Sequence, residues 1–218
     1  MRRASPPPRH DGGPAADCPL CPRLAAFRAA NATAQPAWHN APVPSFGGLD
    51  AALLIVGLAP GLRGANATGR PFTGDYAGAL LYPTLLKSGF AKGHYGATPD
   101  DGLRLIAARI TNAVRCVPPQ NKPTGPEIKA CAPFLDAEIA AMPGLRCIVT
   151  LGTIAHGAVR KSLGLKVKEA PFGHGTECRA GGIHVIASYH CSRLNTNTGR
   201  LTTAMFEDIF ARARAVIG

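Results

Sequence analysis

Short apolar runs and longer amphipathic segments alternate along the chain, and each kind of segment predicts one kind of element. The short runs are bounded by glycine, proline or polar residues, which is typical of buried β-strands. Strands are predicted within residues 51–58, 106–114, 146–151 and 183–188. Apolar residues at helical spacing predict helices over residues 77–87, 126–141, 153–162 and 201–217, and a short helix that begins at the cysteine pair 18 and 21.

Strands that alternate with helices predict an α/β fold. The connections imply a mostly parallel sheet of four strands with helices on both faces, a three-layer αβα arrangement. The length of 218 residues suits one domain, which we place at residues 17–218 after a flexible basic tail over residues 1–16. Ligands of such folds bind beyond the carboxyl ends of the strands, so a site is expected in the loops after Leu58, Thr111 and Ser188.

The charge balance favours a polyanionic partner. Lysine and arginine number 24 against 13 acidic residues, which gives a formal charge of +11. Nucleic acid is the first candidate, although the same positive charge would also attract an anionic membrane surface or an acidic protein. The longest apolar run is too short to cross a bilayer, so no membrane span is expected. Residues 1–16 contain no apolar stretch typical of a secretion signal, and a cytoplasmic location is therefore expected.

The seven cysteines favour metal binding over a disulfide framework, because their number is odd and no export signal is evident. Two residues separate Cys18 from Cys21, and fourteen separate Cys116 from Cys131. Four thiolates from these two pairs suit either zinc or an iron-sulfur cluster, and the spacing does not choose between them. The alternative is that some of them are ordinary buried cysteines.

The compact cysteine run of a ferredoxin is absent, so a metal centre here is expected to be structural. It would tie the N-terminal segment to the segment from Cys116 to Cys131 and so close a long loop. Cys147 falls in a predicted strand and Cys178 in a glycine-rich loop, and both are interpreted as bystanders.

Three further segments carry polar and aromatic residues in the loops that follow predicted strands. They are residues 57–61 leading to 69–75, residues 110–116 and residues 188–195. Together with the four cysteines, over residues 18 to about 210, they resemble the iron-sulfur branch of the uracil-DNA glycosylase superfamily, most closely family 5, also called type B.

The resemblance implies a DNA repair hydrolase. Such an enzyme flips uracil, hypoxanthine or xanthine out of DNA and hydrolyses its N-glycosidic bond, which initiates base excision repair. The resemblance also implies a 4Fe-4S cluster held by Cys18, Cys21, Cys116 and Cys131, and no nucleotide cofactor. We expect the protein to act as a monomer.

Four residues resemble the family's base-binding groups, and His190 resembles its catalytic histidine. Phe72 would stack on the flipped base, and Asn112 would read its polar edge, because one amide offers both a donor and an acceptor. Gly57 and Ala59 would lie beside the base. His190 would stabilise negative charge on the base carbonyl as the bond to the sugar breaks. Without the resemblance, core packing, a turn and a structural histidine would be the ordinary interpretations of Phe72, Asn112 and His190.

Asp75 is the candidate catalytic carboxylate. Many superfamily members place an acidic or amide side chain directly after the first strand, but Leu58, Ala59 and Gly61 offer none, and family 5 has the same gap. Asp75 lies in the loop that follows and would orient water or stabilise a cationic sugar. An aspartate beside Gly74 is otherwise typical of a turn.

The third motif supplies the candidate DNA contacts. Leu194 resembles the wedge that fills the space left by the flipped base, and Ser192, Arg193 and Asn195 would contact DNA. The usual motif reads His-Pro-Ser-Pro, whereas this chain has Cys191 and Arg193 in place of the two prolines. A more mobile wedge loop is expected from this change.

Two other functions remain open. The missing carboxylate of the first motif is the best argument for a metal-stabilised DNA-binding module without catalysis. A uracil-only enzyme like the family 4 glycosylases would share the cluster, but those enzymes typically carry glutamate in the first motif, where this chain has Leu58.

Overall fold

The computed structural model describes residues 12–218 and contains a central sheet whose strand order is β4-β1-β5-β7-β6. Its strands are β1 (Leu53–Gly57), β4 (Ala108–Asn112), β5 (Cys147–Leu151), β6 (Glu177–Ala180) and β7 (Ile183–Ser188). Four of them pair in parallel, whereas β6 is antiparallel to β7. The predicted α/β class is confirmed, but the sheet has five strands and not four.

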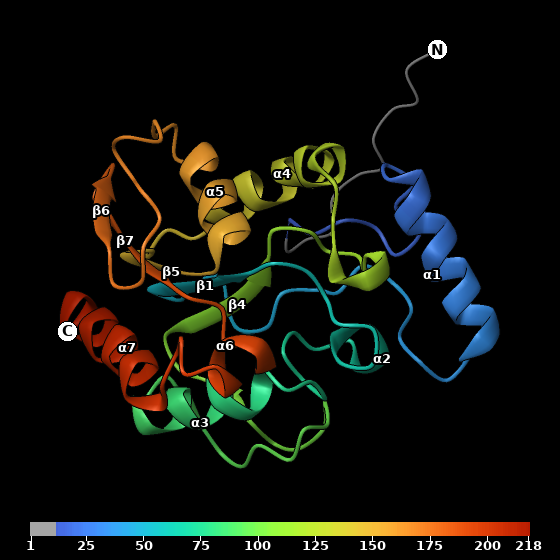
Figure 1. Cartoon of the computed structure of the whole chain (residues 1–218), viewed down its shortest axis with the longest axis horizontal. Coiled ribbons are helices and arrows are strands. Elements are labelled where there is room, and N and C mark those ends of the chain that lie inside the picture. Colours follow the sequence, from blue (N-terminus) through green and yellow to red (C-terminus); the bar gives the residue numbers. More distant parts are fainter. Residues whose placement is uncertain (1–11) are drawn as a thin grey trace.

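Four helices form the two outer layers of the fold, namely α3 (Gly78–Lys87), α4 (Gly125–Ala140), α5 (Thr153–Ser162) and α7 (Thr203–Ile217). The other helices are α1 (Pro22–Ala34), which lies to one side of the sheet, and the short α2 (Ala65–Thr68), α6 (Arg193–Asn197) and 3-10 helix η1 (Pro119–Asn121). Figure 1 shows α4 and α5 on one face of the sheet and α3 and α7 on the other. Elements that the sequence did not predict are α2, α6, η1, β6 and the small hairpin of β2 (Ala91–Lys92) and β3 (Arg104–Leu105).

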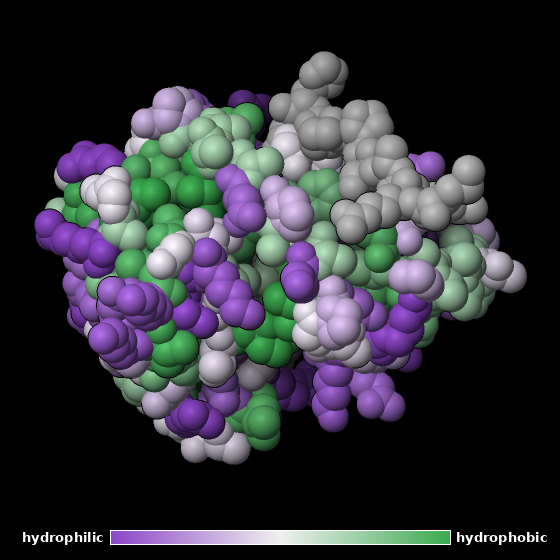
Figure 2. All heavy atoms as spheres, turned by 90° about the horizontal axis from the view of Figure 1, so that it is seen from above, coloured by the Kyte–Doolittle hydropathy of each residue, from purple (hydrophilic) through white to green (hydrophobic). Residues whose placement is uncertain are grey.

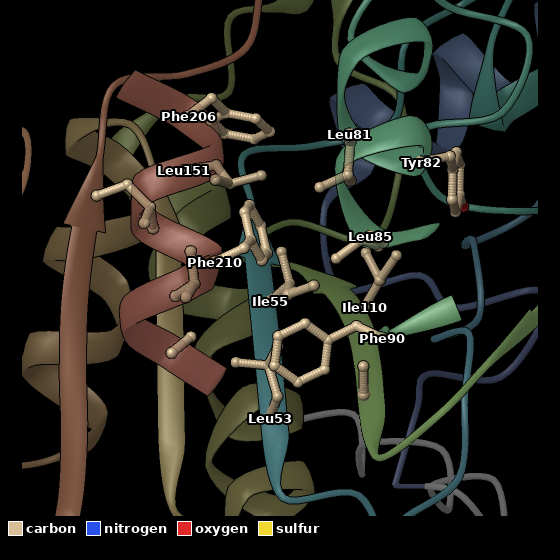
Figure 3. Packing of buried hydrophobic residues seen from close by; sticks show 14 of the residues in the cluster. Leu53, Ile55, Leu81, Tyr82, Leu85, Phe90, Ile110, Leu151, Phe206 and Phe210 are labelled. Carbon is tan, nitrogen blue, oxygen red and sulfur yellow. The ribbon is translucent and has the colours of Figure 1, made fainter. Parts of the chain in front are cut away.

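Successive residues of β1 supply the two halves of the core, because neighbouring side chains of a strand point to opposite faces. Leu53 and Ile55 belong to the larger cluster, which α3 and α7 cover, and Figure 3 shows Ile55 beside Phe210 of α7 and Leu53 beside Phe90. Leu54 and Val56 belong to the cluster packed under α4 and α5. All positions of β1 are buried, as expected of a central parallel strand.

Cys178, predicted to lie in a loop, lies in β6, the strand that the sequence did not predict. β6 and β7 form a hairpin in which Ala180 pairs with Ile183 across Gly181 and Gly182, both at positive φ. A two-glycine turn of this kind is a hairpin signal. Cys178 therefore lies in an edge strand and not in a loop, while Cys147 lies in a strand as predicted.

The packed part of the chain begins before the expected boundary at residue 17. Gly13 and Pro14 are buried, and a side chain at Gly12 would contact Ala137 of α4. Residues 1–11, most of the predicted basic tail, lie outside the described part of the chain.

A buried charged triad joins β4 to α4. Glu138, which is fully buried in α4, accepts hydrogen bonds from Nε of Arg109 at 2.6 Å and from Arg115. Arg115 also donates to Ser45 Oγ at 2.7 Å. Because buried charges are stable only when they are paired and hydrogen-bonded, this triad fixes the strand against the helix.

The outer surface shown in Figure 2 has polar residues interspersed among apolar ones, as on an ordinary solvent-exposed face. Within residues 12–218, no helix is long and apolar enough to pass through a bilayer.

Candidate active site and cysteine cavity

The loops after β1, β4 and β7 meet around a cavity of about 400 Å³. This is the edge of the sheet at which the sequence predicted a site, because parallel strands end there together. The cavity is lined by Leu58, Ala59, Pro60, Gly61, Ala65, Phe72, Asp75, Tyr76, Ala77, Asn112, Asn121, His190, Ser192 and Arg193. Seven of the residues expected to act on a base or on DNA therefore line one cavity: Ala59, Phe72, Asp75, Asn112, His190, Ser192 and Arg193.

Asn112 and Phe72 meet over Gly57. Asn112 is the last residue of β4 and pairs with Gly57, the last residue of β1. A Cβ at Gly57 would collide with Asn112 Oδ1 and would lie 2.5 Å from Phe72 Cζ. Glycine is therefore required where the amide and the ring approach the backbone. Asn112 is only 4% exposed, and its Oδ1 has no hydrogen-bond partner among the described residues. An unpaired buried oxygen is costly and indicates a place for a ligand.

Phe72 is held in a strained conformation. Its φ is +55°, a region that side chains other than glycine rarely adopt. Tyr95 donates a hydrogen bond to its carbonyl oxygen at 3.2 Å, and a Cβ at Gly78 would collide with the same oxygen. The preceding Arg70 forms a buried bidentate ion pair with Asp101, with distances of 2.8 and 2.7 Å. These contacts hold the backbone segment that carries Phe72 in place.

Asp75 lies at the start of α3, where the amide of Gly78 donates to its Oδ1 at 3.0 Å. Burial raises the pKa of this carboxyl above its ordinary value, and the backbone hydrogen bonds from Gly78 and Ala77 oppose that rise only in part. A Cβ at Gly64 would lie 2.8 Å from Asp75 Oδ2, so the absence of a side chain there makes room for the carboxylate. Asp75 therefore lies in a turn, as its neighbour Gly74 suggested, and it also lines the cavity.

His190 follows β7 and faces Phe72, with ring centroids 6.1 Å apart and planes inclined by 30°. Burial lowers the pKa of His190 to about 4, so its imidazole is neutral at pH 7. Its side chain makes no hydrogen bond within the described part of the chain. A neutral imidazole without a partner offers a ligand one donor and one acceptor.

The third motif forms α6 at the rim of the cavity. Leu194 is 72% exposed, so its side chain is accessible to another molecule and contributes little to the core. Ser192 and Arg193 line the cavity. Asn195, predicted to contact DNA, instead donates through Nδ2 to the carbonyl of His190 at 2.8 Å and so ties α6 to the histidine.

Four lining residues were missed by the sequence interpretation, namely Ala65, Tyr76, Ala77 and Asn121. Ala65 begins a four-residue helix that has no strong pattern. Asn121 is at φ +57°, directly after Gln120 at +56°, in the loop that follows Cys116. For Tyr76, the one sequence feature that could have indicated a place in the site was its position directly after Asp75.

The four cysteines expected to bind metal line one small cavity, which they share with Pro14, Leu20, Leu24, Val114, Ala130 and Phe134. Cys18 and Cys21 precede α1, Cys116 follows β4, and Cys131 lies in α4. Among residues 12–218, no three side chains of the usual ligand types are already arranged around a single metal ion.

Two hydrogen bonds reach the sulfur atoms of this cavity. Arg28 donates through Nη1 to Cys116 Sγ at 2.8 Å, and the amide of Arg115 lies 3.3 Å from Cys131 Sγ. Arg28 is buried and forms no salt bridge with a carboxylate of the described residues; its other hydrogen bond goes to the carbonyl of Cys18 at 3.0 Å. Burial raises the pKa of the Cys116 thiol to about 11, and the adjacent Arg28 guanidinium opposes that rise, so Arg28 favours the thiolate form that a metal site requires.

Comparison with known proteins assigns the chain to a family. The profile of the Uracil DNA glycosylase superfamily matches residues 44–214. A type-5 uracil-DNA glycosylase of Thermus thermophilus is 45% identical over 208 residues, covering 92% of this chain and 94% of the relative. That of Pyrobaculum aerophilum is 40% identical over 209 residues, covering 93% and 90%. A type-4 uracil-DNA glycosylase of the same organism is 34% identical over 128 residues, covering 58% and 57%. The resemblance drawn from the motifs is confirmed, and the chain belongs to the uracil-DNA glycosylase superfamily.

Proposed function

We propose that this protein hydrolyses the N-glycosidic bond of uracil and related deaminated bases in DNA, after flipping the base into the cavity. The observation that carries the proposal is the unpaired, buried Oδ1 of Asn112 in a cavity that Phe72, Asp75 and His190 also line. An aromatic wall, a fixed amide, a carboxylate and a neutral imidazole are the groups that base recognition and glycosidic cleavage need.

The proposed range of bases rests on the buried amide of Asn112. This amide lies against the backbone of Gly57 with its Oδ1 unpaired among the described residues, so a base can donate a ring N–H to Oδ1 and accept from Nδ2. Uracil, hypoxanthine and xanthine share a carbonyl beside a ring N–H, which complements an amide. Cytosine and adenine present an amino group beside a ring acceptor, the reverse order. Deamination is therefore the change that such a site detects.

Asp75 and His190 have different roles in the proposed reaction, Asp75 at the sugar or the attacking water and His190 at the base. As the glycosidic bond breaks, positive charge develops on the sugar and negative charge on the base. The Asp75 carboxylate orients the attacking water or offsets the charge on the sugar. The neutral imidazole of His190 donates a hydrogen bond to the base carbonyl; burial lowers the pKa of His190 to about 4, so the imidazole stays neutral at pH 7.

A 4Fe-4S cluster held by Cys18, Cys21, Cys116 and Cys131 is proposed as a structural group. The support is a set of four thiols from separate segments around one cavity, with Arg28 and a backbone amide donating to two of the sulfur atoms. Hydrogen bonds to cysteine sulfur are a regular feature of such sites. The cluster, when bound, would tie the segment before α1 to α4.

Base release from a panel of oligonucleotides tests the proposed function. We expect single-turnover release of uracil, hypoxanthine and xanthine from duplexes and no release of cytosine or adenine. Release of uracil alone would favour the enzyme of the family 4 kind, and binding without any release would favour the non-catalytic module. Either result would contradict the breadth proposed here.

Leu194→Ala should lower release from a stably paired duplex by about 10- to 100-fold. Unstacking a base step costs about a few kcal/mol, and the leucine side chain is proposed to offset part of that cost by filling the space left by the flipped base. Release from a single strand should change little, since no stacked neighbour then has to be held apart. Val167→Ala is the matched control, because Val167 is also exposed (67%) and lies outside the cavity lining. An equal loss on both substrates would show that Leu194 is not the wedge.

A further inference from the structure

The helix that carries Leu194 has little support of its own. α6 spans five residues, Arg193–Asn197, and none of them is buried. A helix this short is not stable in isolation, so its orientation depends on contacts with other segments. Within its own segment, Ser192 accepts a weak cap hydrogen bond from the amide of Asn195 at 3.5 Å.

Tyr76 supplies the contacts that come from a distant segment. Its hydroxyl donates to Asn197 Oδ1 at 3.2 Å, and it lies 3.1 Å from the hydroxyl of Thr196, which shares its one hydrogen between Tyr76 and the carbonyls of Ser192 and Arg193. The guanidinium of Arg193 lies 5.0 Å from the centre of its ring. Both ends of α6 are therefore fixed to one side chain, which comes from a position about 120 residues earlier in the chain.

Tyr76 is also the residue next to Asp75, and both line the cavity. The loop between β1 and α3 thus holds the proposed catalytic carboxylate and, one residue later, the anchor of α6. The two prolines of the usual third motif, which would stiffen the wedge loop through the backbone, are replaced here by Cys191 and Arg193. The contact between Tyr76 and α6 restricts the same loop through side chains.

We propose that Tyr76 is a positioning residue that holds α6, and with it Leu194, in register with Asp75 during base flipping. This inference rests on the proposed function and deepens it. Tyr76 is 40% exposed and is not part of the core, so its removal is expected to leave the global fold intact. Its effect should appear where the wedge is needed, which is on duplex DNA.

The test uses Tyr76→Phe in the full chain, because phenylalanine keeps the ring under Arg193 and removes only the hydroxyl. Single-turnover release of uracil is measured on a duplex and on the same single strand. We expect the duplex rate to fall about three- to tenfold, the range given by losing two partly exposed hydrogen bonds, and the single-strand rate to change less than about twofold. Asn197→Ala should produce part of the same loss and should not add to it in the double variant.

Hydrogen exchange gives a readout that does not depend on activity. In Tyr76→Phe the peptide covering residues 191–200 should exchange faster, because the amides of Thr196 and Thr198 are protected only while α6 is formed. Tyr95→Phe is the matched control: it also removes one tyrosine hydroxyl near the site, but that hydroxyl bonds the carbonyl of Phe72 and not α6. It should leave both the exchange of residues 191–200 and the ratio of the two rates unchanged.

Unchanged exchange of residues 191–200, or an equal fall on duplex and single strand, would overturn the positioning role and leave the proposed function standing. A wild-type protein that releases uracil from neither substrate would overturn the proposed function, and the inference with it.

Discussion

Asp75→Asn is expected to lower base release from uracil-containing DNA by about 10²- to 10⁴-fold, the usual contribution of a positioned acid or base. The affinity for duplex DNA should stay nearly the same. The carboxylate acts on charge or water that exists only in the transition state, so its loss lowers turnover and not binding. Asparagine keeps the size of the side chain and an oxygen that accepts the amide hydrogen bond of Gly78.

The raised pKa of Asp75 adds two expectations to this experiment. The wild-type rate should fall on acidification at a pH above the ordinary aspartate value of 3.8, because the carboxylate becomes protonated there. This acid limb should be lost in Asp75→Asn. A raised pKa also means that the folded state favours the protonated form, so the ionised group lowers stability as the pH rises through that pKa. The neutral variant should therefore unfold, at pH 7, at a temperature no lower than the wild type.

His190→Ala serves as the comparison for Asp75→Asn. His190 acts on the base, so its loss should depend more on which base is released, since a better leaving group needs less help. Near-full activity of Asp75→Asn on uracil, hypoxanthine and xanthine alike would contradict the catalytic role of Asp75. The water would then have to be positioned by His190 or by backbone groups in the loop after Leu58.

Cys131→Ala is expected to lose the cluster and much of the stability. The wild-type protein should be brown, with iron and sulfide near four each per chain. The variant should be colourless, and its unfolding midpoint should fall by about 10 to 20 °C, since closing a loop of about a hundred residues is worth about 4 to 5 kcal/mol in the chain-entropy model. Activity should fall as well, because only residues 113–115 separate Asn112 in the cavity from Cys116.

The remaining cysteines provide the controls. Cys147 is fully buried in β5 and Cys178 lies in the edge strand β6, and neither lines the cysteine cavity. Cys178→Ser and Cys147→Ala should therefore stay brown. A wild-type protein that contains zinc and no iron would contradict the cluster, and a coloured Cys131→Ala would remove Cys131 from its ligands.

The sequence was most informative where an element crosses the core. Apolar runs located β1 and β5, because every position of these central parallel strands is buried. The runs at residues 106–114 and 183–188 located β4 and β7. β6 escaped because its side chains alternate between exposed and half-buried over only four residues. α6 escaped because five residues without a buried face carry no helical period.

The candidate site divides in the same way. Residues at or just after the ends of strands, such as Asn112 and His190, were found from their motifs, and the structure brings both to one cavity. The contacts that hold these residues in place could not be predicted from the sequence. The strain of Phe72 and the link from Tyr76 to α6 depend on contacts between segments far apart in the chain, which a local pattern does not encode.

The charged triad under β4 restricts how relatives of this protein can diverge. Changing Glu138 alone leaves Arg109 and Arg115 buried without a counter-charge, and breaking such a set typically costs about 3 to 5 kcal/mol, a large part of a domain's stability. Replacing all three by apolar residues of similar volume avoids that cost. Single substitutions within this trio are therefore disfavoured, and positions 109, 115 and 138 should covary in alignments.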